Sequence, residues 1–139
     1  MKKRLKFILI PVFGYLGFWL SGCLFFLLYF KIFNVPMDLD NTGMIKSIPS
    51  VLSIFTVLVC SFLSFFLTTK IVVRKNSQDA NTIKPVSLGF FALSFTIALD
   101  LLITVGVQNV DIFIFPVNLM YLLAWLVIIP AILLAWRVK

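Results

Sequence analysis

Four long apolar runs, separated by short polar segments, constrain this chain more than any other feature of its sequence. They extend over residues 7–30, 48–69, 86–107 and about 113–136. Each run holds slightly more than 20 residues. A helix that rises about 1.5 Å per residue needs about 20 residues to cross a hydrocarbon core of about 30 Å. The runs therefore predict four transmembrane helices.

The composition supports the same class of protein. Of the 139 residues, 62% are hydrophobic and only 12% are charged, whereas about 25% are charged in a typical soluble domain. The four runs use almost the whole length and leave no room for a folded domain outside the membrane. We predict an all-α integral membrane protein in which residues 1–139 form a single four-helix transmembrane domain, packed as an antiparallel up-down bundle.

The basic residues predict how the chain is oriented. Ten of the twelve lie before the first run, in or beside the second loop, or at the end of the chain: Lys2, Lys3, Arg4, Lys6, Lys70, Arg74, Lys75, Lys84, Arg137 and Lys139. Lys31 and Lys46 lie on the other side. The positive-inside rule then predicts that both termini are cytoplasmic, in an inner or plasma membrane. We expect the net charge of +7 to serve topology and contacts with anionic lipids of the cytoplasmic face, not nucleic-acid binding.

The residues that the chain lacks argue against an enzyme. It has no His, and its five acidic residues are all Asp, so a Ser-His-Asp triad, an HExxH zinc site and a pair of catalytic Glu residues are excluded. A GxxxxGK[ST] phosphate loop is also absent. We predict no catalytic residue, no metal site and no cofactor.

The cysteines raise two alternatives to a four-helix protein with free thiols: cleavage and lipidation at Cys23, or a disulfide between Cys23 and Cys60. The segment "LSGC" at residues 20–23 matches the pattern of a bacterial lipoprotein cleavage site. The apolar run continues beyond Cys23 without a polar break and is longer than a signal-peptide core, so we expect it to remain as the first helix. A disulfide to Cys60 is not expected, because counting the rise of each helix separates the two cysteines by roughly 10 Å in depth.

Small residues fall on one face of each of the first two helices. Gly14, Gly17 and Ser21 share a face of the first helix. The second helix carries a stripe of Ser50, Ser53, Ser61, Ser64 and Thr68. In lipid, such stripes allow backbones to approach closely and form hydrogen bonds between helices. Along the fourth helix, Ala124, Ala131 and Ala135 share a face, and Pro130 predicts a bend.

Asp100 is the one acid deep inside a run. Thr96 lies one helical turn before it and Thr104 one turn after it on the same face. Counting the helical rise places Asp100 level with residues 53–56 of the second helix and 21–23 of the first. An ionised Asp at this depth is costly, so we expect it to be protonated, paired or in contact with water. The candidate site for a proton, a cation or a partner is Asp100, Thr96, Thr104 and Ser53.

Three functions fit these features. The first is a non-enzymatic accessory, regulatory or binding subunit that docks as a homo-oligomer or on a larger membrane protein. The second is a small homodimeric transporter that couples a proton or cation to Asp100. In length, helix number and its single buried acid the chain resembles the small multidrug resistance transporters, although their essential Glu of the first helix has no counterpart here. The third is a holin-like pore former, which the small size, basic ends and several spans suggest, although the helices lack the continuous polar face that a water-filled pore would use.

Overall fold

The computed structural model describes residues 6–36, 38, 48–106, 113 and 117–138, and no strand occurs among them. Within these residues, four helical segments are long and apolar enough to cross a membrane: Lys6–Phe33, Ser50–Lys75, Pro85–Val105 and Val117–Arg137. The prediction of an all-helical chain with four potential membrane spans is confirmed. Several residues used to predict orientation and span ends lie outside the described residues: Lys2, Lys3, Arg4, Lys46, residue 107 and Lys139.

The first span consists of a 3-10 turn, η1 (Lys6–Ile8), and the helix α2 (Leu9–Phe33). It ends three residues beyond the predicted boundary, where Asn34 adopts a left-handed conformation with φ 49°. Asparagine tolerates this conformation better than most residues and often ends a helix in this way. The helix includes Lys31 because a long basic side chain can extend its charge toward water from an apolar helix.

The second span is α3 (Ser50–Lys75). Pro49 sets its start: the Pro49 carbonyl accepts hydrogen bonds from the amides of Leu52 and Ser53 at 2.9 and 3.1 Å. The helix continues beyond the predicted end at residue 69 and closes with Arg74 and Lys75, because basic side chains near a helix C-terminus interact favourably with its dipole. The short helix α4 (Ser77–Ala80) follows.

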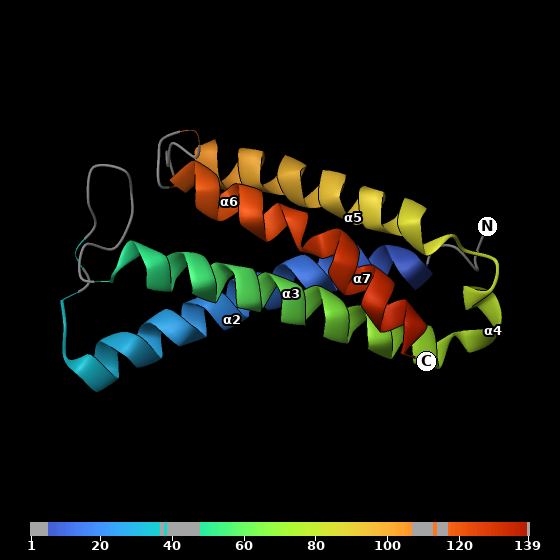
Figure 1. Ribbon diagram of the computed structural model, residues 1–139, viewed down its shortest axis with the longest axis horizontal. Helices are drawn as coiled ribbons and strands as arrows, with labels where there is room; N and C mark the ends of the chain where they lie inside the picture. The colour runs from blue at the N-terminus through green and yellow to red at the C-terminus, as the bar shows by residue number, and fades with distance from the viewer. Residues whose placement is uncertain (1–5, 37, 39–47, 107–112, 114–116, 139) are drawn as a thin grey trace.

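The third and fourth spans each contain an irregularity. The third begins with α5 (Pro85–Asp100), with Pro85 in the first turn, where its missing N–H costs no hydrogen bond, and continues as a π-helix, η2 (Leu101–Val105). The fourth is divided at Val127 into α6 (Val117–Leu126) and α7 (Ile128–Arg137), and Figure 1 shows the bend between them. Pro130 explains the division, because it has no N–H to bond the carbonyl four residues earlier.

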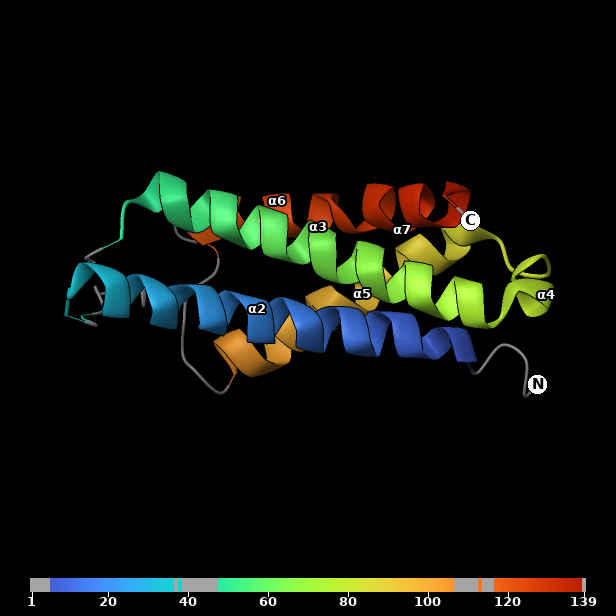
Figure 2. The same ribbon diagram turned by 90° about the horizontal axis from the view of Figure 1, so that it is seen from below.

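Helix contacts join the four spans side by side. Helix α3 contacts α2, α6 and α7, and α5 contacts the same three helices. In Figures 1 and 2, α2 and α5 run in one direction while α3, α6 and α7 run in the other. The beginning of η1 and the end of α7 therefore lie at the end of the molecule that carries α4, called here the α4 end.

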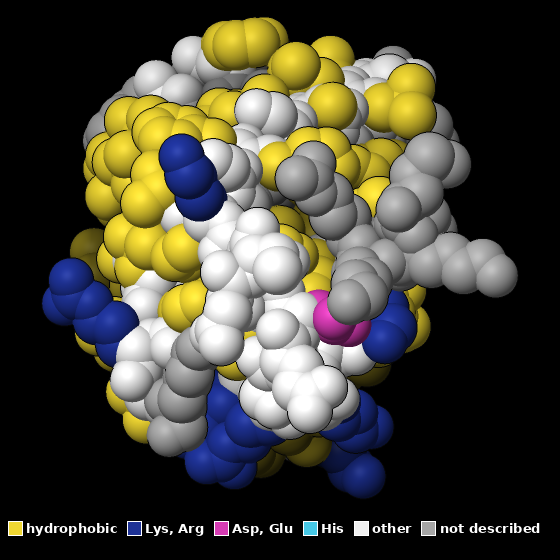
Figure 3. All heavy atoms as spheres, turned by 90° about the vertical axis from the view of Figure 1, so that its right-hand side faces the viewer, with side chains coloured by type: hydrophobic (Ala, Val, Ile, Leu, Met, Phe, Trp, Pro, Cys, Tyr) yellow, Lys and Arg dark blue, Asp and Glu magenta, His cyan; other side chains and the backbone are white. Residues whose placement is uncertain are grey.

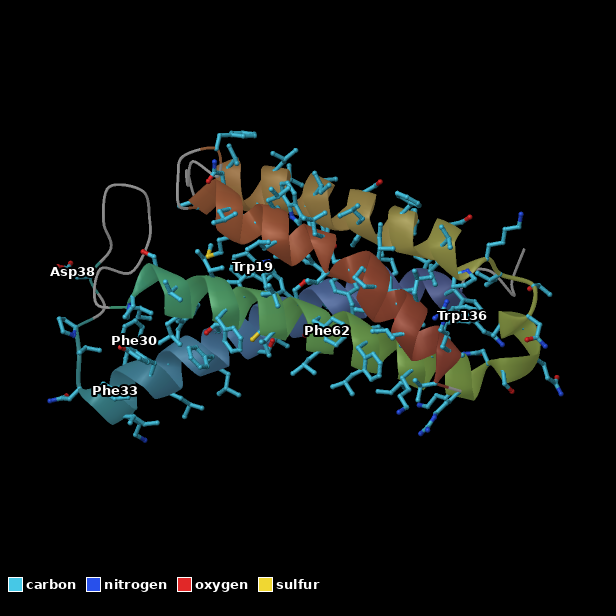
Figure 4. All side chains as sticks on the ribbon, viewed as in Figure 1. Trp19, Phe30, Phe33, Asp38, Phe62 and Trp136 are labelled. Atoms are coloured by element: carbon cyan, nitrogen blue, oxygen red, sulfur yellow. The ribbon has the colours of Figure 1, made fainter. Side chains whose placement is uncertain are left out.

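The packed core is concentrated toward the α4 end. The largest cluster of buried hydrophobic side chains is Phe7, Ile10, Phe65, Val73, Ala80, Leu88, Ala92, Ile128, Ala131, Ile132 and Trp136. In α2 every fully buried residue lies between Ile10 and Tyr15. The rest of α2, residues 16–33, extends away from Trp136 toward Phe30 and Phe33, which Figure 4 shows at the far end of the molecule. We call residues 16–33 the distal part of α2.

Candidate functional site

Asp100 occupies the junction between two kinds of helix. It is the last residue of α5, and the π-helix η2 begins at the next residue. Its side chain is only 1% exposed. The Gly106 amide bonds the Leu101 carbonyl, five residues earlier, at 3.2 Å. Single π-turns inside α-helices occur frequently at functional sites, which makes the surroundings of Asp100 the first place to search for one.

Both oxygens of the Asp100 carboxyl group accept a hydrogen bond from another span. Tyr15 of α2 donates its hydroxyl to Oδ1 at 2.9 Å. Trp125 of α6 donates its indole N–H to Oδ2 at 2.7 Å. Both donors are neutral, and each approaches from a different helix. The carboxyl group therefore links three of the four spans.

A third, longer hydrogen bond lies beside the first two. Tyr121 donates its hydroxyl to Oγ1 of Thr104 at 3.4 Å, and both side chains are buried. Tyr121 and Trp125 are four residues apart on the same face of α6, with ring centroids 6.1 Å apart. We refer to Tyr15, Asp100, Thr104, Tyr121 and Trp125 as the Asp100 cluster.

The structure brings only part of the predicted site together. Asp100 and Thr104 both belong to the cluster, although Thr104 pairs with Tyr121. Thr96 is 3% exposed, and its hydroxyl has no hydrogen-bond partner among the described residues. Ser53 is buried on α3, and within the described part of the chain no hydrogen bond connects it to Asp100.

Sequence reasoning missed Tyr15 and Trp125. Counting the helical rise placed residues 21–23 level with Asp100, whereas Tyr15 lies six or more positions earlier in the chain. The count assumed that the spans begin at the same level, but Asp100 lies fifteen residues after the start of the third span whereas Tyr15 lies nine residues after the start of the first. A usable signal was present, because a Tyr or Trp buried in an apolar span needs a partner for its polar group, and an unpaired acid is such a partner.

The glycines of the predicted packing stripe lie at the contact between α2 and α3. A Cβ atom added to Gly14 would stand 2.6 Å from the ring of Phe65, and one added to Gly17 would stand 3.4 Å from Ser64. Ser64 is half-buried at this contact. The absence of a side chain at Gly14 therefore lets the Phe65 ring pack directly against the backbone of α2.

The serines of the two stripes behave differently from one another. Ser61 donates to the carbonyl of Ala124 at 2.9 Å and so connects α3 with α6. Ser21 instead donates to Phe18 of its own helix at 3.0 Å, a common alternative for serine in a helix. Ser50 is exposed at the start of α3. Only Ser61 thus forms a hydrogen bond between spans among the described residues of these stripes.

A small cavity adjoins the Asp100 cluster. Its volume is about 130 Å³, and it is lined from α2, α3 and α6 by Phe18, Trp19, Gly22, Cys23, Phe26, Val57, Met120 and Tyr121. Trp19 contacts Tyr15 with ring centroids 6.4 Å apart, and Figure 4 shows it on the side of α2 that faces α6. The buried indole N–H of Trp19 has no hydrogen-bond partner among the described residues.

The remaining candidate groups of the described residues are dispersed. Cys23 is exposed and Cys60 is half-buried, and both are free thiols. No group of three or more His, Cys, Asp or Glu side chains that could hold a metal ion occurs in the described ranges. The Asp100 cluster, with its adjoining cavity, is therefore the strongest candidate for a functional site.

Comparisons with protein-family models, curated proteins and solved structures found no match for this chain. The Asp100 cluster and the surfaces of the four spans are therefore the features that bear on its function.

Proposed function

We propose that this chain is a non-enzymatic accessory or binding subunit of a cell membrane, folded as an antiparallel four-helix bundle with both termini in the cytoplasm. One observation carries the proposal: the two oxygens of Asp100 are already occupied by Tyr15 and Trp125. A carboxyl group held by two donors from other spans stabilises the arrangement of the helices. The polar groups of the Asp100 cluster hold the protein's own helices together. We therefore assign its function to the outer surface that the packed helices present to a neighbouring protein.

The distribution of charge supports the proposed orientation. Arg74 and Lys75 end α3, and Arg137 ends α7. In the view onto the α4 end in Figure 3, Lys and Arg side chains gather around the rim. Basic residues that flank membrane spans are enriched on the cytoplasmic side. This end would then face the cytoplasm and its anionic lipids.

The distal part of α2 is the surface that we assign to a partner. Its large apolar side chains include Leu20, Leu24 and Leu28, which are 70%, 59% and 49% exposed. No residue of this segment is fully buried in the isolated chain. The segment therefore offers an exposed apolar face to a transmembrane helix of a larger membrane protein or of a second copy.

Site-specific photocrosslinking in native membranes tests this proposal. A benzoylphenylalanine at position 24 of α2 is expected to give one crosslinked product of defined mass, and that partner should co-purify in fixed ratio with the unmodified chain. The matched control is the same probe at Phe90 of α5, which is 57% exposed, close to the 59% of Leu24. Equal crosslinking from both positions, or none from position 24, would contradict the assignment of this surface.

A proton- or cation-coupled transporter, acting as a homodimer, is the second candidate. The cavity beside the Asp100 cluster favours it, because its lining includes the rings of Phe18, Trp19 and Tyr121 and aromatic faces attract cations. In this function Asp100 would exchange its hydrogen bonds for the proton or cation. A pore-forming function has less support, because the buried residues of α7 are all hydrophobic and Tyr15 is the only buried residue of α2 with a polar group in its side chain.

Transport by the purified protein separates the two candidates. The chain is reconstituted into liposomes, and uptake of the lipophilic cation tetraphenylphosphonium is measured under an imposed pH gradient. The accessory function predicts no uptake above that of protein-free liposomes. Uptake that disappears in Asp100→Asn, while the variant keeps its helical circular dichroism spectrum, would instead establish the transporter.

A further inference from the structure

A groove of about 370 Å³ opens at the α4 end of the molecule. It lies where the first span begins at Lys6 and the third begins at Pro85, and so at the level where the apolar spans meet the polar connecting segments. Its size is within the range of about 300–1,000 Å³ that is usual for ligand pockets. The groove is separate from the Asp100 cluster and shares no residue with it.

One side of the groove is polar and basic. Thr82, Lys84 and Ser87 contribute to its lining. Thr82 donates its hydroxyl to the Asp79 carbonyl at 2.7 Å, which leaves Lys84 and Ser87 as the side-chain donors. Lys84 is exposed and forms no ion pair with any described residue, whereas nearby Lys6 pairs with Asp79 at 3.5 Å. Among the described residues, the positive charge of Lys84 on the polar side of the groove therefore has no ion-pair partner.

The other side of the groove is apolar and open. Phe7, Leu88 and Phe91 contribute to its lining. Phe7 and Leu88 belong to the buried core, so this wall is fixed in place. Phe91 is 47% exposed, so this apolar wall is accessible from the lipid that surrounds the spans. A ligand that fills the groove needs an anionic group near Lys84 and a hydrocarbon portion against Phe91.

We propose that this groove binds an anionic phospholipid, with its phosphate at Lys84 and Ser87 and an acyl chain against Phe7 and Phe91. The phosphate chemistry alone would also suit free inorganic phosphate, but that ion leaves the apolar wall unused. The inference rests on the proposed orientation, since the α4 end must face an anionic leaflet. It does not depend on a protein partner, and the failure of the crosslinking experiment would leave it intact.

Native mass spectrometry of the purified full chain measures the binding directly. The protein in detergent is titrated with dioleoylphosphatidylglycerol and, separately, with dioleoylphosphatidylcholine. We expect Lys84→Gln to weaken binding of the first phosphatidylglycerol roughly fivefold, the equivalent of about 1 kcal/mol for one basic residue near an anionic surface. Binding of phosphatidylcholine should not change, because its headgroup carries no net charge.

Arg74→Gln is the matched control for charge. Arg74 is an exposed basic residue in the last turn of α3, and it does not line the groove. This variant should bind phosphatidylglycerol as the unmodified chain does. Equal losses in both variants would overturn the site in favour of general attraction to the basic end, and an unchanged Lys84→Gln would overturn it outright.

A competition arm distinguishes the lipid from free phosphate. Inorganic phosphate at millimolar concentration, compared with the same ionic strength of chloride, is not expected to displace bound phosphatidylglycerol. Displacement by phosphate alone would identify an ion site and contradict the proposed lipid. Phe91→Ser supplies a second check, because it should weaken phosphatidylglycerol binding although it leaves Lys84 and Ser87 in place.

Discussion

Asp100 is a polar residue that the membrane interior tolerates because two other spans supply its hydrogen bonds. The Tyr15 hydroxyl and the Trp125 indole take the place of water at its two oxygens. A buried donor that loses its acceptor costs more free energy than a formed hydrogen bond contributes. Both donors would lose their acceptor together if the carboxyl group were removed.

We therefore expect Asp100→Leu to lower the free energy of unfolding by roughly 1–3 kcal/mol. Asp100→Asn retains one carbonyl oxygen as an acceptor and should lose less. The measurement is unfolding by sodium dodecyl sulfate in mixed micelles, followed by circular dichroism. Ser94→Leu is the control, since it replaces an exposed hydroxyl of the same helix. An Asp100→Leu variant as stable as Ser94→Leu would show that the three-span link contributes little.

The glycines of α2 offer a second test at single-residue resolution. In Gly14→Ala, the new methyl group would meet the Phe65 ring at 2.6 Å, and Phe65 is fully buried. We expect this variant to be destabilised by about 1–3 kcal/mol, the usual cost of overpacking. Gly22→Ala makes the same chemical change where nothing lies within 4 Å. Thermal unfolding in detergent should separate the two variants, and equal melting temperatures would contradict the close contact.

The sequence identified Asp100 as the residue to explain, but not the residues that explain it. A single acid in an apolar run is visible without a structure, because the cost of burying it is intrinsic to the residue. The hydrogen-bond partners of Asp100 depend on how deep each span lies in the membrane and on how far it is rotated about its own axis. Tyr15 could not be derived from helical rise alone, since the first and third spans are offset from each other along the bundle.

At the scale of a single element, Pro130 shapes the fourth span. The helix is divided at Val127, so α6 and α7 can pack against different neighbours: Tyr121 and Trp125 serve the Asp100 cluster, while α7 contributes to the core at the α4 end. Sequence predicted this bend because proline removes a defined backbone hydrogen bond. The π-helix after Asp100 was not predictable, since hydrophobic residues on every side of an apolar span conceal a local change of periodicity.

Restoring the missing N–H should straighten this span. In Pro130→Ala, the distance between spin labels at positions 119 and 134 is expected to increase, because the ends of a straight helix lie farther apart than those of a bent one. Both positions are exposed, at 37% and 45%. Double electron–electron resonance measures the distance after Cys23 and Cys60 have been replaced by Ala. Pro85→Ala should leave it unchanged, and an unchanged distance in Pro130→Ala would assign the bend to tertiary packing.

At the scale of the whole molecule, orientation is the property that matters most for the proposed function. We expect a C-terminal green fluorescent protein fusion, expressed in a bacterial host, to be fluorescent and a C-terminal alkaline phosphatase fusion to be inactive. The positive-inside rule gives the reason. Replacing Arg74 and Lys75 by Gln should weaken this preference. An active phosphatase fusion of the unmodified chain would reverse the proposed topology.

The number of spans was predictable from sequence because the hydrocarbon core imposes a minimum length and an apolar composition on every segment that crosses it. Contacts between spans have no comparable signature. Apolar side chains are suitable both for lipid and for packing, so the same kind of residue lies in the core at Phe65 and on the surface at Phe55. A contact such as that of Gly14 with the Phe65 ring can be identified only from the structure.

The unequal lengths of the spans have a consequence for the surrounding bilayer. Among the described residues, the first two have 28 and 26 residues and the last two have 21 each, which corresponds to about 42 and 39 Å against about 32 Å. The apolar runs within them are nearly equal in length, so the additional turns of the first two spans extend past the hydrocarbon core. In α3 these turns end with Arg74 and Lys75 at the level of the lipid headgroups. Headgroup charge and ionic strength are therefore the bilayer properties to which these turns are expected to respond.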